Sequence, residues 1–376
     1  MQDPKKVRVS LAILFALVFF YLFESFRLYP IESIGFNFPL LLRIAVLWAG
    51  VVVLNMLFYV VCVKDQGWQG FWKELFTVFY SVIMLFYLLE GFFIFYPKTH
   101  SAGNTALSNI SWASYYNSSK NEYDFRDHPV GNLERKKVIY AIGDSFAGGW
   151  GIKNIDQRYS NILEKKLGPD YRVLNMGVPG FGTRQEIYVL NKFLNVYDVK
   201  KPDLVIWQYY VNDILGLGAP PAEVFDGYRH RSPLVKYVVQ NSFFLNFLYW
   251  LFPQKFDMDY DQYLETYFLN HEEKLRLHLS DIAFLTRMCK DKKIPLIVIG
   301  FPSLSDMDKT GPFIFFLEQF FAQEHVDFIN ICRLVKDIPF KERIVAINDP
   351  HPSLRVHRLV ADELFLRIKT MDLYKK

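Results

Sequence analysis

The sequence is poor in cysteine and lacks any metal-binding spacing. It holds three cysteines in 376 residues, with no C-x-x-C pair and no Cys/His zinc pattern. This excludes a zinc module and a dense disulfide scaffold. The count leaves a single disulfide open, between Cys289 and Cys332, and it does not identify an oxidising compartment.

Signals for nucleotides, calcium and nucleic acids are absent as well. The glycines form neither G-x-G-x-x-G nor a P-loop. The acidic run Asp257, Asp259 and Asp261 begins like a calcium loop, but Gln262 stands where such a loop needs glycine. The net charge of +4 is small and evenly spread, which argues against nucleic-acid binding. We therefore expect no cofactor, no bound metal and no nucleic-acid partner.

Aromatic residues, in contrast, are abundant and crowd the first hundred positions. The chain has 36 Phe and 23 Tyr, and apolar stretches cover about 7–23, 40–63 and 75–96. A helix needs about 20 apolar residues to cross a membrane, so the second and third stretches are long enough and the first is marginal. A cleavable signal peptide is the alternative for the first, but FESFR after it offers no small-x-small cleavage site. We expect three transmembrane helices within residues 1–97.

Basic residues predict the orientation of this anchor. They precede the first stretch and lie between the second and third, whereas the loop between the first and second has only Arg27 against two glutamates. The N-terminus then lies in the cytoplasm, and three crossings place everything after Pro97 outside it. The prediction is a multi-pass membrane protein with an extracytoplasmic domain, periplasmic or at the cell surface. The basic residues in question are Lys5, Lys6, Arg8, Lys64 and Lys73.

Two ionisable residues fall inside the predicted membrane helices. Arg43 lies near the outer end of the second helix, and Glu90 lies a little inside the outer end of the third. A charge within a membrane is a candidate for function. The alternative is that both side chains reach the outer interface or pair with each other. We take an Arg43–Glu90 contact that fixes helix packing as the hypothesis.

A polar connector rich in Ser, Asn and Tyr covers residues 98–136, and an α/β domain follows over 137–376. Short apolar runs alternate there with helical patterns, which predicts a parallel sheet with helices on both faces. In such sheets the active crevice lies beyond the carboxyl ends of the strands. The expected strands are 138–142, 172–176, 203–208, 295–300 and 326–331, and the expected helices are 157–167, 183–196, 261–292, 312–324 and 354–369.

Three short stretches at predicted strand ends carry residues suited to acyl transfer. The first, GDSF, places Ser145 directly after a strand, where unpaired backbone N–H groups stabilise developing negative charge. The second, NMGVPGFGT over 175–183, contains glycines, Gly180 among them, that let the backbone approach a ligand closely. The third, QYYVNDI, holds Asn212, whose side-chain amide is an oxyanion donor that stays neutral at any pH.

A fourth stretch, NDPHP, places His351 between two prolines just ahead of an amphipathic helix. Imidazole is the side chain suited to take a proton from serine near neutral pH. Asp349, two residues before the histidine, and Asn348, three before, are both candidates to orient it. His357 falls inside the following helix and is expected to be structural. Taken singly, each of the four stretches is equally typical of an ordinary turn, cap or anion site.

In this order the four stretches resemble the SGNH, or GDSL-type, hydrolase family over about residues 138–368. The resemblance implies a three-layer α/β/α, flavodoxin-like domain. It also implies Ser145 as the nucleophile and His351 as the base, with the backbone amide of Gly180 and the side chain of Asn212 as oxyanion donors.

The acid of the family pattern is the point at which this sequence departs from many members. The acid often stands three residues before the histidine, where this chain has Asn348. The D-x-H-P variant of the pattern favours Asp349 instead. The resemblance then implies acyl transfer in two steps through an acyl-enzyme.

The expected function is that of a membrane-anchored serine esterase or O-acyltransferase. Its substrates would be acyl esters of cell-envelope glycans or lipids, and a membrane acyltransferase is the partner expected for a transfer reaction. The alternative is a non-catalytic subunit that binds glycan or scaffolds an envelope-modification complex.

An insertion over about 215–260 interrupts the α/β pattern. It contains the apolar stretch VKYVVQNSFFLNFLYWLF over 235–252, which carries one charge. A fourth membrane crossing here would separate Asn212 from His351. We therefore expect a lid or a helix that rests on the membrane beside the active crevice, with a buried crossover helix as the alternative.

Overall fold

The computed structural model describes residues 45, 48–59, 71–117, 120–213, 231–252 and 272–371. The chain divides into two compact units. The first, called here the N-terminal unit, holds residues 1–98, 104–115 and 232–253. The second, called the α/β unit, holds residues 99–103, 116–231 and 254–376. Two stretches beyond the predicted anchor thus belong to the N-terminal unit.

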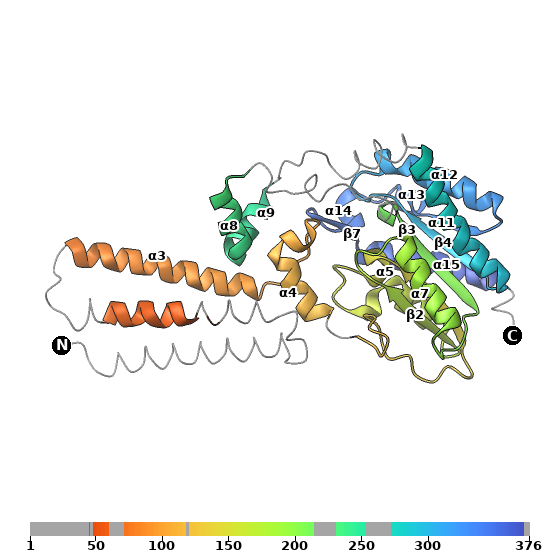
Figure 1. Ribbon diagram of the computed structural model, residues 1–376, viewed down its shortest axis with the longest axis horizontal. Helices are drawn as coiled ribbons and strands as arrows, with labels where there is room; N and C mark the ends of the chain where they lie inside the picture. Colours follow the sequence, from red (N-terminus) through yellow and green to blue (C-terminus); the bar gives the residue numbers. More distant parts are fainter. Residues whose placement is uncertain are drawn as a thin grey trace. The chain divides into compact units, whose positions relative to one another are not determined.

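A five-stranded parallel sheet forms the centre of the α/β unit, as predicted, in the order β2-β1-β3-β4-β5 (Figure 1). This is the flavodoxin-like strand order. The strands are nearly continuous apolar runs because both faces of the sheet are covered, and every residue of the second and third strands is buried. The strands are β1 (Lys137–Gly143), β2 (Tyr171–Gly177), β3 (Leu204–Tyr210), β4 (Leu296–Phe301) and β5 (Asp327–Asn330).

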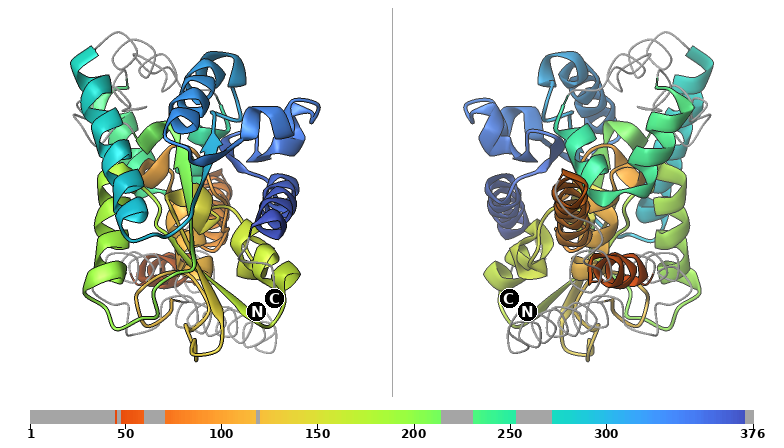
Figure 2. Two further views of the ribbon diagram at one scale, coloured as in Figure 1. Left: turned by 90° about the vertical axis from the view of Figure 1, so that its right-hand side faces the viewer. Right: turned by 90° about the vertical axis from the view of Figure 1, so that its left-hand side faces the viewer.

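Helices cover both faces of this sheet and give the three predicted layers. They are α6 (Tyr159–Leu167), α7 (Thr183–Asn195), α11 (Glu272–Asp291), α12 (Met307–Gln323) and α15 (Leu354–Thr370). On one face, Trp207 of β3 donates a hydrogen bond to Glu186 of α7, and Tyr209 bonds to His278 of α11. Trp207 also packs against Phe321 of α12. Helices α6 and α15 contact each other on the opposite face (Figure 2).

The strands and helices expected in this unit are confirmed, with ends shifted by a few residues. The helix expected over 312–324 begins earlier, at Met307, and the one expected over 261–292 is described from Glu272. Short elements that the sequence pattern did not predict lie before the last helix, and two of them form an antiparallel strand pair. They are α13 (Ile331–Val335), α14 (Phe340–Arg343), β6 (Ile344–Ala346) and β7 (Asp349–Pro352).

The expected polar connector contains a helix that the sequence analysis did not predict. Its first part forms α4 (Leu107–Tyr116), on which Trp112 is 2% exposed. The polar composition concealed this helix because some of its polar side chains are buried and paired. Ser111 Oγ, for example, donates a hydrogen bond to the carbonyl of Ile94. Later in the connector, Phe125 and Leu133 belong to the hydrophobic core of the α/β unit.

One of the three predicted membrane helices has support. Helix α3 (Phe71–Ile94) contains Glu74–Ile94, the one stretch among the described residues that is long and apolar enough to cross a membrane. The first predicted helix, 7–23, lies outside the described residues. The second, 40–63, is described only in part, and its helix over Trp48–Phe58 is shorter. The other two crossings therefore stay predictions.

The apolar stretch 235–252 of the insertion is not one helix. It divides at Ser242 into α8 (Pro233–Asn241) and α9 (Phe243–Leu251). Nine residues rise about 14 Å, so neither helix crosses a membrane. Both belong to the N-terminal unit, so the alternative of a crossover helix buried against the sheet is wrong. Arg43 lies outside the described residues, and its predicted contact with Glu90 stays a prediction.

The disulfide that the cysteine count left open does not form. Cys289 and Cys332 are buried free thiols. Burial raises the pKa of Cys289 to about 12 and that of Cys332 to about 11. Both therefore stay protonated and unreactive near neutral pH.

Candidate active site

Ser145 lies where β1 ends and the short helix α5 (Ser145–Gly148) begins. Asp144 caps this helix, because its carboxylate accepts a hydrogen bond from the amide of Phe146 at 2.8 Å. Gly149 ends the helix in the left-handed region at φ 70°, and its amide donates to the carbonyl of Ser145. The serine thus occupies a tight turn that is fixed at both ends, called here the nucleophile turn.

The side chain of Gln208, on β3, hydrogen-bonds to the backbone of the nucleophile turn. This side chain is fully buried, and its Oε1 accepts hydrogen bonds from the amides of Ala147 at 2.9 Å and Asp144 at 3.2 Å. Gly143 sits at φ +155°, and a Cβ there would lie 2.5 Å from the same oxygen. Sequence analysis did not single out Gln208, because a glutamine at the end of an apolar run looks like the edge of a strand.

The second glycine-rich stretch packs directly against the nucleophile turn. A Cβ on Gly177 would lie 2.2 Å from the amide nitrogen of Gly148, so only glycine fits there. Asn175 ties the two segments together, since its Nδ2 donates to the carbonyl of Ala147 at 2.8 Å. Beyond this contact Gly180 is exposed at φ +84°, and its amide donates no hydrogen bond to another described residue.

His351 reaches the serine from the β6–β7 hairpin. Its Nε2 lies 2.8 Å from Ser145 Oγ, and its Nδ1 lies 2.5 Å from Asp349 Oδ1. Of the two candidates to orient the imidazole, Asp349 therefore makes the contact. Asn348 instead uses its backbone carbonyl to accept a hydrogen bond from the amide of Ser101.

The electrostatic setting keeps Asp349 ionised. Burial raises the pKa of its carboxyl, but the charge of His351 and the hydrogen bonds from that residue outweigh burial and hold the pKa below its usual range. An ionised carboxylate on Nδ1 fixes the tautomer in which Nε2 faces the serine without a proton. The three side chains can therefore move a proton from Ser145 to His351.

Asn212 follows β3 in a single helical turn, beside the nucleophile turn. Its side chain is partly buried and hydrogen-bonds to the Asp144 carboxyl. Burial raises the pKa of Asp144 to about 6, and the amide of Phe146, the charge of His351 and the side chains of Asn212 and Gln208 oppose that rise. The segment that holds Asn212 is thus in contact with the segment that holds Ser145, through the Asp144 carboxyl.

His357 has no part in this arrangement. It is buried in α15, and its Nδ1 accepts a hydrogen bond from the amide of Tyr159 at 3.2 Å. Burial, together with the charges of Arg158, His351 and Arg126, lowers its pKa to about 3. The imidazole is therefore neutral and fixed, in line with the structural role expected for it.

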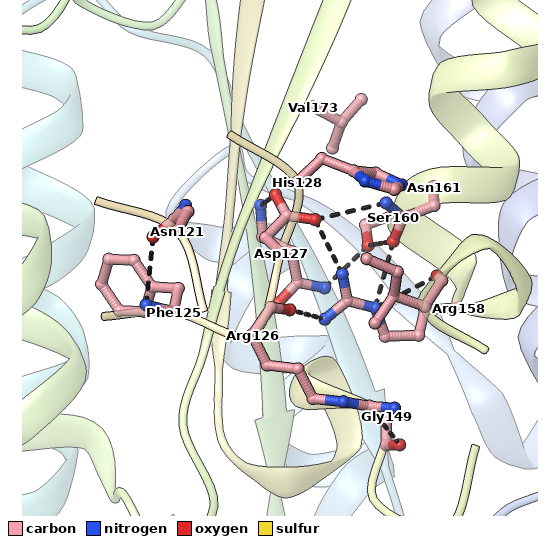
Figure 3. A network of polar contacts seen from close by, with 12 residues as sticks. Asn121, Phe125, Arg126, Asp127, His128, Gly149, Arg158, Ser160, Asn161 and Val173 are labelled. Atoms are coloured by element: carbon pink, nitrogen blue, oxygen red, sulfur yellow. Dashed lines mark hydrogen bonds and ion pairs between the residues drawn. The ribbon is translucent and has the colours of Figure 1, made fainter. Parts of the chain in front are cut away.

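Arg126, near the end of the predicted connector, stabilises the backbone after Ser145, and sequence analysis missed this residue. Arg126 is buried, and its guanidinium donates to the carbonyls of Gly148 and Gly149, both at 3.1 Å, and of Ile152 at 2.6 Å. The Arg126 guanidinium therefore binds several backbone carbonyls that follow Ser145; Figure 3 shows its contact with Gly149. No local motif marks this role, because the acceptors are backbone carbonyls.

Asp127 joins the same network through its carboxylate (Figure 3). Oδ1 pairs with Arg158 at 2.7 Å, with both side chains fully buried, and Oδ2 pairs with Arg172 at 3.3 Å. Oδ2 also accepts the amide of Asn175 at 3.0 Å. Asp127 thus pairs with Arg158 beneath the nucleophile turn and shares Arg172 with Glu164, whose carboxylate lies 2.6 Å from that guanidinium.

We expect Asp127→Asn to destabilise the protein by about 3–5 kcal/mol, because it removes the carboxylate that pairs with the buried guanidinium of Arg158. Urea unfolding of the full-length protein in detergent, followed by tryptophan fluorescence, measures the change. Asp124→Asn is the matched control, since Asp124 pairs with Lys120 at the surface and should make no measurable difference. Equal effects from the two substitutions would contradict the role given to the network.

Two further buried carboxyls lie around Asp144. Glu186 accepts a hydrogen bond from Trp207 Nε1 at 2.7 Å, and Asp213 accepts one from the amide of Tyr210 at 3.1 Å. Burial, followed by repulsion from the neighbouring carboxyls, raises the pKa of both well above the ordinary range. The folded protein therefore retains protons on these groups at pH values where the unfolded chain has lost them.

The contribution of these two carboxyls to stability should consequently fall as pH rises above about 4, where unfolded carboxyls ionise. Glu186→Gln removes one of these proton-linked contributions while its Oε1 still accepts from Trp207. We expect its free energy of unfolding, relative to wild type, to increase between pH 5 and pH 8. Urea unfolding at a series of pH values tests this, with pH 4 as the internal control. A relative stability that is constant or falls with pH would contradict the buried, protonated state of Glu186.

Comparison with known proteins gives a likeness in fold alone. No family model and no curated protein matches the chain. Solved structures similar to it include a lipolytic G-D-S-L family protein from Veillonella parvula, 14% identical with a TM-score of 0.38. Others are a carbohydrate acetylesterase family member from Sinorhizobium meliloti, at 14% and 0.36, and AlinE4, an SGNH-hydrolase family esterase, at 20% and 0.35. They align over 97–100% of their own length and 62–64% of this chain, and values this low assign it no function.

Proposed function

We propose that the α/β unit is a serine esterase or O-acyltransferase of the SGNH type. One observation carries the proposal, the continuous contact from Ser145 Oγ to His351 Nε2 at 2.8 Å and from His351 Nδ1 to Asp349 Oδ1 at 2.5 Å. A nucleophile, a base and an acid that orients the base are the parts that acyl transfer requires.

In the first step the Ser145 Oγ attacks the carbonyl carbon of an acyl ester while its proton moves to His351 Nε2. The tetrahedral intermediate collapses, the bond to the leaving alkoxide breaks, and His351 returns the proton to that alkoxide. In the second step water or an acceptor hydroxyl gives its proton to His351 and attacks the acyl-enzyme. Ser145 then recovers its proton, and a free acid or a new ester is released.

The developing oxyanion would be held by the amides of Ser145 and Gly180 and by the side chain of Asn212. The open space around Gly180 supports this role, since a substrate can approach its amide without meeting a Cβ. The tie between Gly177 and the nucleophile turn supports it as well, because it holds the loop of Gly180 to the turn of Ser145.

The proposed setting is the outer side of a membrane that α3 crosses. The length and apolar composition of Glu74–Ile94 support a crossing, and the basic residues of the N-terminal sequence favour an extracytoplasmic α/β unit. Acyl esters of envelope glycans or lipids are the substrates within reach of such an enzyme. A membrane acyltransferase that supplies acyl groups is the partner proposed for the transfer reaction.

A fluorophosphonate tests the proposed nucleophile. We expect intact mass spectrometry of the full-length protein in detergent to find one adduct on the wild type and none on Ser145→Ala. His351→Ala should slow labelling by roughly 10²–10⁴-fold, the usual contribution of a general base. Ser305→Ala, at an exposed serine, is the control and should label like the wild type.

An adduct that persists in Ser145→Ala would overturn the assignment of the nucleophile. A folded wild type that takes no label would favour the alternative, a subunit that binds glycan or scaffolds a complex without catalysis.

A further inference from the structure

Glu90 holds the beginning of α9 against α3. It lies one turn before the end of α3 and is 7% exposed. Its carboxylate accepts hydrogen bonds from Ser242 Oγ at 2.6 Å, from the amide of Phe243 at 2.6 Å and from the amide of Phe244 at 3.0 Å. A side chain from one helix thus caps the N-terminus of another.

This cap would supply hydrogen-bond acceptors to the amides at the N-terminus of α9 if that end of the helix lies in a membrane. The first four amides of any helix lack partners within the helix, and at membrane depth no water replaces them. Glu90 satisfies two of these amides, and Ser242 Oγ accepts from a third, that of Leu245 at 3.1 Å. The carboxylate also faces the positive end of the dipole of α9. The capping of α9 would therefore explain why the apolar helix α3 contains the acidic residue Glu90.

Side-chain packing fixes α9 at this position. Phe244 and Phe247 both stack on Phe93 of α3, with ring centroids 5.6 and 4.3 Å apart. The buried Asn246 accepts from the amide of Leu107 and donates to the carbonyl of Thr105, both at 2.9 Å. The helix is therefore tied to α3 by rings and to the start of α4 by hydrogen bonds.

Exposed apolar side chains form the outer face of α8 and α9. The two helices carry one charged side chain between them, Lys236. Large apolar side chains there are between 36% and 71% exposed, including the residue that follows α9. They are Leu234, Val235, Tyr237, Leu248, Leu251 and Phe252.

The place of Glu90 along α3 sets the depth of this face. The 21 residues Glu74–Ile94 rise about 31 Å, which matches a hydrocarbon core of about 30 Å. Glu90 lies about 6 Å from the end of that stretch. Amphipathic helices at a membrane surface insert to a depth of about 5–10 Å. The capped end of α9 therefore lies at the depth at which such helices rest.

We infer that α8 and α9 form an interfacial helix pair whose outer apolar face inserts into lipid and whose position is set by the Glu90 cap. The inference builds on the proposed crossing of the membrane by α3. It explains why part of the insertion in the α/β unit packs within the N-terminal unit, and why leucines are exposed on both short helices.

Spin labels on the full-length protein in liposomes test this inference. Single cysteines at Leu234 and Leu251, in a chain whose native cysteines are alanine, are probed with oxygen, which dissolves in lipid, and with a water-soluble nickel chelate. We expect both sites to be open to oxygen and to lose access to nickel. Val82 on α3 is the lipid control, and Tyr188 on α7 is the water control; both side chains are exposed, at 61% and 59%.

The spin labels distinguish lipid contact of α8 and α9 from the crossing of the membrane by α3. Lipid contact at Val82 but water at Leu234 and Leu251 would overturn the interfacial pair and leave the anchor standing. Water at Val82 would overturn the membrane crossing itself. Shielding of Leu251 from both reagents would overturn lipid contact in favour of a protein partner or a second copy. Fluorophosphonate labelling of Ser145 on the same samples reports the proposed catalysis independently.

A second variant tests the cap. Glu90→Ala removes the acceptor of the α9 amides, and we expect Leu251 to regain access to nickel, with Val82 unchanged. Glu90→Gln keeps one acceptor oxygen and should have a smaller effect. Lipid contact at Leu251 that is unchanged in Glu90→Ala would overturn the role of Glu90 as the anchor of the pair.

Discussion

The candidate site depends on the way parallel strands end. Neighbouring strands of a parallel sheet present their carboxyl ends at one edge, so β1, β2 and β3 bring Ser145, Gly177 and Asn212 to the same place. The backbones of Gly148 and Gly177 then approach so closely that no Cβ fits between them. His351 lies on the β6–β7 hairpin, outside the five-stranded sheet. Its contact with Ser145 therefore depends on the position of the hairpin relative to the end of β1.

Buried polar groups beneath the nucleophile turn hold it in one arrangement. Arg126 binds the carbonyls that follow Ser145, Gln208 binds the amides around it, and Asp127 pairs with the neighbouring guanidinium groups. Such a network is costly to desolvate and is stable only when each member is paired. Its benefit is rigidity around Ser145, which the proposed reaction needs because the serine would have to meet its base and oxyanion donors without rearrangement.

Much of the α/β unit was predictable because its signals are local. Buried parallel strands appear as short apolar runs, helices repeat every three to four residues, and Ser145, Asn212 and His351 each follow a predicted strand or precede a predicted helix. The choice between Asn348 and Asp349 needed the hairpin, because both lie within reach of the histidine along the sequence.

What sequence analysis missed consists of partners distant in the chain. Arg126 acts on backbone carbonyls, which leave no trace in the sequence. Glu90 caps a helix that begins 153 residues later, at Phe243. The division of 235–252 at Ser242 had a local sign, because the polar residues Gln240, Asn241 and Ser242 interrupt the apolar stretch there, but the carboxylate that stabilises the break is distant in the chain.

A crystal structure of the fluorophosphonate-treated protein would show whether Ser145 is a nucleophile that faces a preformed oxyanion site. This assignment of Ser145 predicts phosphorus bonded to Ser145 Oγ. It also predicts the phosphonyl oxygen about 2.7–3.1 Å from the Gly180 amide and the Asn212 side-chain nitrogen. Phosphorus on another residue, or a phosphonyl oxygen turned to solvent away from Gly180 and Asn212, would contradict it.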